Sequence, residues 1–320
     1  MKTILVTGAE GFVGSHLIQF LKHKGYDVVA GVRNRARKLT LEKRFGRALV
    51  CDVSDAINVA RVIASAKPDG IIHLAAMSRA GEATAEPLTA YQSTVTAWAN
   101  VLDGARRAVP RARVLMVSAA DVYGATARSG QALTEDAALD PVSTFGSLRA
   151  TAETIAHTFF RNYHLNVSIA RPFLHTGAGQ SPEFYFANIA KRVAQWDGAL
   201  GQQLALSDLD FRRDLCHVAD VIDAYERILR EGKPNEIYNV CAGQSSTCRE
   251  FVESMVQAAG RELTLVDQPS PASDEEPIPT LCGSADKLIR ELRWQPKLTW
   301  RDAIRDLVLS YQTAKQPIAS

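Results

Sequence analysis

The feature that most constrains the fold is a glycine turn near the amino terminus. Gly8, Gly11 and Gly14 form the pattern G-x-x-G-x-x-G. A β-branched run at residues 2–7 precedes the turn, and residues 12–24 follow it with apolar side chains at helical spacing. Between a strand and a helix, this pattern is typical of a turn that brings a pyrophosphate close to the amides of a helix N-terminus. The sequence therefore predicts a dinucleotide-binding strand–turn–helix unit.

Strand-like and helix-like patterns alternate through the first half of the chain. Short apolar runs predict strands at residues 2–7, 28–32, 48–52, 70–75, 114–117 and 167–171. Apolar residues at helical spacing predict helices at residues 12–24, 55–66, 88–105 and 143–163. This order is typical of an α/β fold with a doubly wound parallel sheet, the Rossmann fold.

The alternation loosens after residue 172. Gly, Pro, Ser and acidic residues predict loops at 177–182 and 270–279, whereas 218–230, 246–259 and 300–311 predict helices and 237–240 predicts a strand. We therefore expect a Rossmann domain over residues 1–173, to which the chain returns at about 216–242. Residues 174–215 and 243–320 are expected to form a smaller, interleaved lobe.

Composition excludes several classes of protein. The chain has 320 residues, 46% of them apolar and 22% charged, which argues against disorder. A net charge of +2 gives no general attraction to nucleic acid or to an acidic membrane, and no apolar run reaches the ~20 residues of a membrane span. Five cysteines without a C-x-x-C pair argue against a disulfide framework or a zinc site. We therefore expect a cytoplasmic protein with no metal.

The end of the second predicted strand bears on the choice of dinucleotide. NAD sites usually carry an acidic residue there for the ribose hydroxyls, but this sequence has Arg33, Asn34 and Arg35. A guanidinium group can hold a 2′-phosphate through two hydrogen bonds, so NADP(H) is favoured over NAD. The alternative is that these cations only begin a solvated basic helix. Asp52 and Val53, after the third strand, are expected beside the adenine.

Eight segments, in order along the chain, resemble a known family. They are TGAEGFVG, CDVSD, IIHLAA, SAADVYG, ARPFLHTGAGQ, RRDLCHVADV, IYNVCAGQ and RWQPKLTW. Together they resemble the extended short-chain dehydrogenase/reductase (epimerase/dehydratase) family, and most of all its GDP-mannose 4,6-dehydratase and GDP-4-keto-6-deoxy-mannose reductase branch. The resemblance covers nearly the whole chain. It implies a Rossmann domain holding NADP(H), a second lobe holding a nucleotide-diphospho-sugar, and a homodimer built from two long helices per subunit.

The resemblance completes the predicted cofactor site. The residues expected to contact the dinucleotide are Gly8, Gly11, Phe12, Val13, Gly14, Arg33, Asp52, Val53, Leu74, Ala75, Ala76, Arg149 and Pro172. Leu74, Ala75 and Ala76 follow the fourth predicted strand and would pass beneath the dinucleotide.

The positions at which this family carries its catalytic groups are altered. Relatives use a Tyr four residues before a Lys on one helix, and a Ser or Thr at the preceding strand end. The resemblance assigns these positions to Phe145, Arg149 and Ala119. Phenylalanine and alanine have no exchangeable proton, whereas arginine keeps the positive charge and can still bind a ribose. We expect the usual proton transfer, worth about 10²–10⁴-fold in rate, to be absent.

Two polar residues near these positions are candidates for proton transfer. Asp121 lies where related dehydratases carry a catalytic Glu and related reductases carry an acid. It is the best remaining proton-transfer group, either with Tyr123 or with a water molecule. The alternative interpretation of Tyr123 is a packing residue, because apolar residues flank it at the strand end.

On the substrate side the resemblance assigns Ser78, His175 and Arg213. Arg213 matches an Arg that approaches the diphosphate in relatives, and a guanidinium fork suits phosphate oxygens. The alternatives are an exposed arginine pair and, for His175, a structural role. Leu174 replaces an Asn that contacts the nucleotide-sugar in relatives. Residues 274–276 are acidic where relatives place a phosphate-binding Arg, and would repel a diphosphate unless they face away.

Three functions remain open from the sequence. The first is an NADP-dependent enzyme of the dehydratase, reductase or epimerase type that modifies a nucleoside-diphosphate sugar with an altered catalytic set. The second is a protein that binds NADP(H) or a nucleotide-sugar with little turnover. The third is a partner subunit of an active relative.

Overall fold

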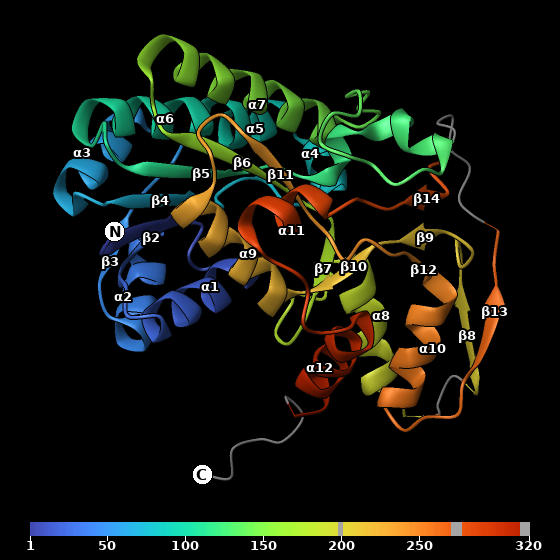
Figure 1. Cartoon of the computed structure of the whole chain (residues 1–320). Coiled ribbons are helices and arrows are strands. Elements are labelled where there is room, and N and C mark those ends of the chain that lie inside the picture. The colour runs from blue at the N-terminus through green and yellow to red at the C-terminus, as the bar shows by residue number, and fades with distance from the viewer. Residues whose placement is uncertain (198–200, 270–276, 314–320) are drawn as a thin grey trace.

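The computed structural model describes residues 1–197, 201–269 and 277–313 (Figure 1). Its centre is a seven-stranded parallel sheet in the order β11–β6–β5–β4–β1–β2–β3. The strands are β1 (Thr3–Thr7), β2 (Asp27–Val32), β3 (Ala48–Val50), β4 (Gly70–His73), β5 (Arg113–Val117), β6 (Val167–Pro172) and β11 (Ile237–Val240). The predicted doubly wound α/β fold is confirmed. The strand order reverses at β1, which pairs with both β2 and β4. Sheets of this kind bind ligands at the carboxyl ends of the strands around such a point.

Helices cover both faces of the sheet (Figure 1). One face carries α3 (Ala56–Ala66), α6 (Ala97–Ala108) and α7 (Thr144–Tyr163). The other carries α1 (Phe12–His23), α2 (Arg35–Phe45), α9 (Val218–Glu231) and α11 (Asp286–Leu292). Two hydrophobic cores result, one on each side of the sheet, and both are buried as a parallel sheet requires.

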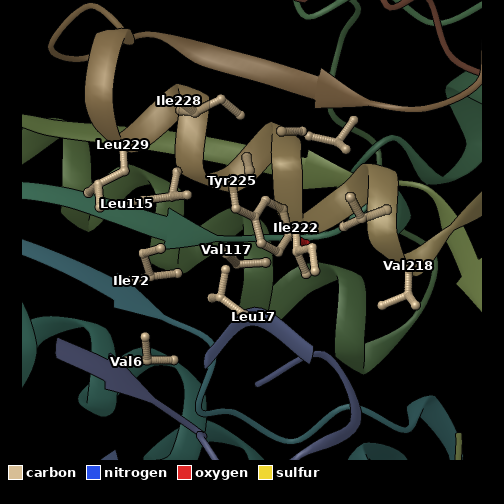
Figure 2. Close-up of a cluster of buried hydrophobic side chains, with 14 of the residues drawn as sticks. Val6, Leu17, Ile72, Leu115, Val117, Val218, Ile222, Tyr225, Ile228 and Leu229 are labelled. Atoms are coloured by element: carbon tan, nitrogen blue, oxygen red, sulfur yellow. The ribbon is translucent and has the colours of Figure 1, made fainter. Parts of the chain in front are cut away.

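Figure 2 shows how α9 covers the sheet. Ile222 and Tyr225 of α9 lie above Val117 of β5, and Leu229 lies near Leu115 of the same strand. Each buried side chain of this size stabilises the fold by about 1.5–3 kcal/mol. The chain therefore returns to the sheet after residue 217, and β11 then adds the last strand.

A second group of elements lies to the right of the sheet and below it in Figure 1. Its paired strands are β7 (Leu174–Thr176) with β10 (Leu215–His217), β9 (Arg212–Arg213) with β12 (Ser246–Thr247) and β14 (Thr280–Leu281), and β8 (Gln203–Leu206) with β13 (Thr264–Asp267). Its helices are α8 (Tyr185–Ala194), α10 (Cys248–Ala258) and α12 (Trp300–Thr313). Phe186, Phe251 and Trp300 stack edge to face, with ring centroids 5.5 and 5.0 Å apart, in a core of their own.

Several predicted boundaries were wrong. The predicted helix 88–105 is divided into α5 (Pro87–Tyr91), a π-helical turn η1 (Gln92–Thr96) and α6, after a short α4 (Ala80–Ala85). The predicted helix 246–259 begins only at residue 248, because residues 246 and 247 pair with β9. Of the predicted loop 270–279, residues 270–276 lie outside the described ranges. No helix in those ranges has the length and apolar composition needed to cross a membrane.

Candidate functional site

The glycine turn is shaped by close approach of the backbone. Gly8 has φ of +68°, and a Cβ there would lie 2.8 Å from the Ala75 nitrogen. A Cβ at Gly14 would overlap the carbonyl oxygen of Gly8. Gly11 is the N-cap of α1 and has no side chain to accept from the first amides of that helix. The predicted turn therefore leaves these amides, with the positive end of the helix dipole, facing the carboxyl edge of the sheet.

The end of β2 combines cations with a carboxylate that the sequence analysis missed. Arg33 and Arg35 are exposed, and the Asn34 side chain caps α2 by accepting from the Arg37 amide at 3.0 Å. Glu10, from the glycine turn, accepts from the Arg33 amide at 3.1 Å through Oε1. Its other oxygen, Oε2, is buried without a hydrogen-bond partner among the described residues. The glycine turn therefore places a carboxylate, that of Glu10, at the end of β2, where the strand itself has no acidic residue.

Other predicted cofactor residues border the same edge of the sheet. Asp52 is exposed and accepts from the Ser54 hydroxyl at 2.6 Å, and Val53 beside it is half-buried. Residues 74–76 are half-buried after β4, while Pro172 is buried at the end of β6. His73 closes β4 and shares a 2.7 Å hydrogen bond with the Thr7 hydroxyl. Burial lowers the pKa of His73 to about 3, with a further contribution from the charge of Arg149.

The structure brings the altered catalytic positions together at the ends of β5 and α7. Ala119 is buried directly after β5, and Asp121 follows in the 3₁₀ turn η2 (Ala120–Val122). Gly146, in the first turn of α7, lies so close to this segment that a Cβ there would be 2.5 Å from the Asp121 carbonyl oxygen. Phe145, half-buried, is therefore adjacent to the Asp121 turn.

Arg149 is buried one helical turn after Phe145, with its guanidinium group 5.1 Å from the ring centroid of Phe145. It donates to the carbonyl oxygens of Val117 at 2.8 Å and Met77 at 3.3 Å, and so ties the segment after β4 to the end of β5. Its Nε is buried without a hydrogen-bond partner in the described ranges. Burial lowers the pKa of Arg149 to about 10, although nearby Asp121 opposes the shift.

Asp121 is exposed as a residue, yet its carboxyl is largely surrounded by protein. Loss of hydration raises its pKa above the usual range, while the charges of Arg149 and Arg213 act in the opposite direction. Asp121 is thus an exposed acid within electrostatic reach of two cations.

Tyr123 lies in a buried hydrogen-bond network. Its hydroxyl donates to Oδ1 of Asn239 at 2.7 Å and accepts from Nη1 of Arg171 at 3.0 Å. Arg171 in turn forms a bidentate ion pair with Glu153 of α7, at 2.7 Å between Nη2 and Oε2. Burial raises the pKa of Tyr123 to about 12. The geometry therefore commits this hydroxyl to the protein interior rather than to the carboxyl edge of the sheet.

The predicted substrate residues come from three separate segments. Ser78 is exposed after β4. His175 lies on β7, shares a 2.8 Å hydrogen bond through Nδ1 with the Phe173 carbonyl, and has its pKa lowered by burial. Arg213, on β9, donates to its neighbouring carbonyl at 2.8 Å and packs over the Phe211 ring, 5.3 Å from its centroid. The predicted acidic segment 274–276 lies outside the described ranges.

Asp214, next to Arg213, is a buried carboxylate to which the sequence analysis gave no role of its own. It accepts from the amides of Ala242 at 2.7 Å, Gly243 at 2.9 Å and Gly283 at 3.4 Å. It thereby joins three segments that are remote in sequence and fixes β9 beside them. Burial raises the pKa of Asp214 to about 6 despite these donors. No cluster of metal-ligating side chains occurs in the described ranges.

Comparison with known proteins now identifies the family. The sequence model of the family described as GDP-mannose 4,6 dehydratase matches residues 5–307. The chain belongs to the GDP-mannose 4,6-dehydratase family. Its expected membership of the larger epimerase/dehydratase group is confirmed by the relatives that follow.

The relatives of this chain include a reductase and an epimerase that are named for different nucleotide-sugars. It is 28% identical to GDP-6-deoxy-D-mannose reductase of Pseudomonas aeruginosa, over 97% of both chains. It is 27% identical to UDP-glucose 4-epimerase 2 of Oryza sativa, over 96% of this chain and 81% of that one. Among solved structures, RMD from Pseudomonas aeruginosa complexed with NADPH is similar, with a TM-score of 0.85, 26% identity, and coverage of 98% of this chain and 100% of that one.

Proposed function

We propose that this member of the GDP-mannose 4,6-dehydratase family is an NADP(H)-binding enzyme that modifies a nucleoside-diphosphate sugar. The observation that carries the proposal is Asp121, an exposed residue whose carboxyl has a raised pKa and is influenced by two arginines. The main chain of Asp121 adjoins the turn of α7 that holds Phe145, so this residue is a candidate proton-transfer group where the usual phenol is absent.

Residues around the strand-order reversal would hold the dinucleotide. The amides at the start of α1 would bind its pyrophosphate, Arg33 its 2′-phosphate, and residues 74–76 would lie beneath its nicotinamide half. When bound, the dinucleotide supplies hydride transfer. The fit is supported by Gly8 and Gly14, where any Cβ would meet backbone atoms at contact distance or closer. It is also supported by the buried polar atoms of Glu10 and Arg149 that have no partner among the described residues.

Asp121 would donate a proton to the oxygen when a sugar carbonyl is reduced, or accept one when a sugar hydroxyl is oxidised. A general acid or base works best when its pKa lies near the working pH, and the raised pKa of Asp121 shifts it in that direction. Because Asp121 is exposed as a residue, solvent can return the proton after each turnover. We assign no proton transfer to Tyr123, whose hydroxyl already has two buried partners.

The lobe made of residues 174–215 and 243–320 would bind the nucleotide-sugar. Arg213 is the candidate for its diphosphate, because a guanidinium group offers paired donors to phosphate oxygens. Asp214 would hold the β9 backbone in place through its three amide partners. Ser78 and His175 are candidates for the sugar.

A second candidate function is a protein that binds the same ligands with little turnover, alone or as a subunit of an active relative. The observation that favours it is that Ala119 and Phe145 both lack the hydroxyl that relatives carry at these positions. The Arg149 side chain, in addition, donates to two carbonyl oxygens of the protein. Binding needs none of these hydroxyls, whereas the usual proton transfer needs them.

Turnover assays separate the two functions. GDP-, UDP- and dTDP-sugars are incubated with NADPH or NADP⁺, and nicotinamide absorbance and product mass are followed. The enzyme proposal expects turnover that Asp121→Asn lowers by about 10²-fold or more. Tight binding without turnover in the parent, together with turnover in the triple variant Ala119→Ser/Phe145→Tyr/Arg149→Lys, would establish the binding protein instead.

We further propose a homodimer formed through α6 and α7, and a cytoplasmic location. The outward face of α7 carries exposed Ser147, Thr151, Thr154 and Thr158, a polar surface without charge before Arg161 in the last turn, and two copies can share it. All five cysteines are unpaired and four of them are buried, as in proteins of a reducing compartment.

A further inference from the structure

Arg149 is a buried cation whose direct hydrogen-bond partners are neutral. Its side chain is only 6% exposed, and both of its hydrogen bonds go to neutral carbonyl oxygens. No carboxylate of the described residues forms an ion pair with it. Arg171, by contrast, is equally buried and is paired with Glu153. Because an unpaired charge in the protein interior acts over several ångströms, Arg149 makes its surroundings positive.

Topology places this charge at one end of the dinucleotide site. The glycine turn between β1 and α1 fixes the pyrophosphate, and β2 and β3 border the half that carries the adenosine. The other mononucleotide half therefore lies over β4 and β5, on the opposite side of the reversal. Arg149 bridges these two strand ends, because its partners are Met77, after β4, and Val117, the last residue of β5. It is thus a cation beside the strand ends over which the nicotinamide half is expected.

The other charged groups around this position leave it net positive. Asp121 and Arg149 influence each other, and Arg213 influences Asp121 from the second lobe. His73, also near Arg149, is kept neutral by burial. Glu153 is already paired with Arg171, and Tyr225 of α9 is a buried neutral phenol. One carboxylate therefore faces two guanidinium groups.

We propose that Arg149 makes this site selective for the redox state of its dinucleotide, so that the reduced form binds more tightly than the oxidised form. The oxidised nicotinamide ring carries a positive charge, whereas the reduced ring is neutral. The two forms share every other group, including the pyrophosphate and the ribose phosphates. A fixed cation beside the ring therefore weakens binding of the oxidised form and leaves the reduced form unaffected. This inference rests on the proposed dinucleotide site.

The test compares the dissociation constants of NADPH and NADP⁺, measured by calorimetry on the same folded protein without substrate. The parent is expected to bind NADPH at least about tenfold more tightly. Arg149→Gln removes the charge and should bring the two constants close together, whereas Arg149→Lys should keep most of the difference. Asp121→Asn removes the neighbouring negative charge and should increase the preference for NADPH.

Arg33→Ala serves as the matched control. Arg33 lies at the far end of the site, where the two redox forms are chemically identical, so its loss should weaken both forms and leave their ratio unchanged. If the parent binds both forms equally, or if Arg149→Gln leaves the ratio unchanged, the inference is overturned while the proposed dinucleotide site stands. If neither form binds, the proposed function itself fails.

Discussion

At the scale of single residues, Glu10 places a carboxylate where the proposed site would hold the adenosine half of the dinucleotide. Its carboxylate reaches the Arg33 amide at the end of β2, although the two residues are 23 positions apart. Glu10→Gln should therefore raise the preference for NADPH over NADH by roughly tenfold, because a carboxylate repels a 2′-phosphate. Arg33→Ala should shift the same ratio in the opposite direction. Titration of both cofactors measures the ratio, and an unchanged ratio in Glu10→Gln would remove Glu10 from cofactor selection.

The position of the Glu10 side chain could not be predicted from the sequence. Residues 31–35, at the end of the second predicted strand, include no acidic residue. The glycine pattern predicts where the turn lies but not where the side chains of its variable positions point. Their direction depends on how β1 and β2 pair, and pairing brings together residues that are remote in the chain. The positions of Phe145, Arg149 and Ala119, by contrast, are what the family resemblance implies from aligned motifs along the chain.

His73 gives the fold a specific dependence on pH. The unfolded chain takes up a proton at this residue below about pH 6.5, whereas the folded chain resists protonation until about pH 3. Stability present at pH 7.5 is therefore lost as the pH falls through this window, by about 2 kcal/mol at pH 5. His73→Asn keeps a polar partner for Thr7 and removes the titration, so its loss of stability between pH 7.5 and 5 should be smaller by that amount.

Urea denaturation at the two pH values measures this difference. His164→Asn is a suitable control, because His164 is exposed and holds a left-handed conformation that Asn tolerates. This control should lose as much stability as the parent. An equal loss in parent and His73→Asn would mean that another group causes the acid sensitivity.

At the scale of elements, α7 is held on the sheet by a buried ion pair as well as by apolar contacts. Glu153 of α7 and Arg171 of β6 are each 2% exposed and are joined at 2.7 Å. Arg171→Met should destabilise the fold by about 3–5 kcal/mol, because it leaves Glu153 charged and unpaired in the interior. The double variant Glu153→Leu/Arg171→Met should recover much of this loss, since neither charge then remains.

Urea denaturation of the single and double variants forms a complete cycle. Arg107→Met provides the surface comparison, because its pair with Asp103 is exposed and should contribute no more than about 1 kcal/mol. If Arg171→Met cost as little as Arg107→Met, the ion pair would not be what holds α7 in place.

Elements with strong periodicity were predictable, and those made by pairing were not. The first helix and the helix from residue 143 were expected close to their observed bounds, because a long amphipathic pattern needs no partner to be recognised. Strand β7 has three residues and exists through its pairing with β10, which lies about forty residues later. The π-helical turn η1 adds one residue per turn within a longer helix, and no local composition signals it.

At the scale of the whole molecule, the net charge of +2 conceals a strong local asymmetry. Exposed cations gather on α2 and at the end of β2, whereas the exposed residues of α7 from 147 to 158, on the other side of the sheet, are uncharged, and an exposed cation, Arg161, comes in its last turn. Two copies can therefore approach through residues 147–158 of α7 without like-charge repulsion. Each threonine of this face bonds its own helix through a carbonyl four residues earlier, as Thr154 does at 3.2 Å, so its hydroxyl needs no water when covered.

The proposed homodimer predicts an apparent mass near twice the 34.9 kDa of the chain. Thr151→Arg/Thr154→Arg would place charged, bulky side chains in a face that is buried in the dimer, and should shift the population to the monomer. Thr40→Arg is the matched control, because Thr40 is also an exposed helical threonine bonded to its own helix, but on α2. Light scattering after size exclusion measures the mass. Thr40→Arg should remain dimeric. If the parent is monomeric, or if the double variant remains dimeric, α7 faces solvent in the working protein.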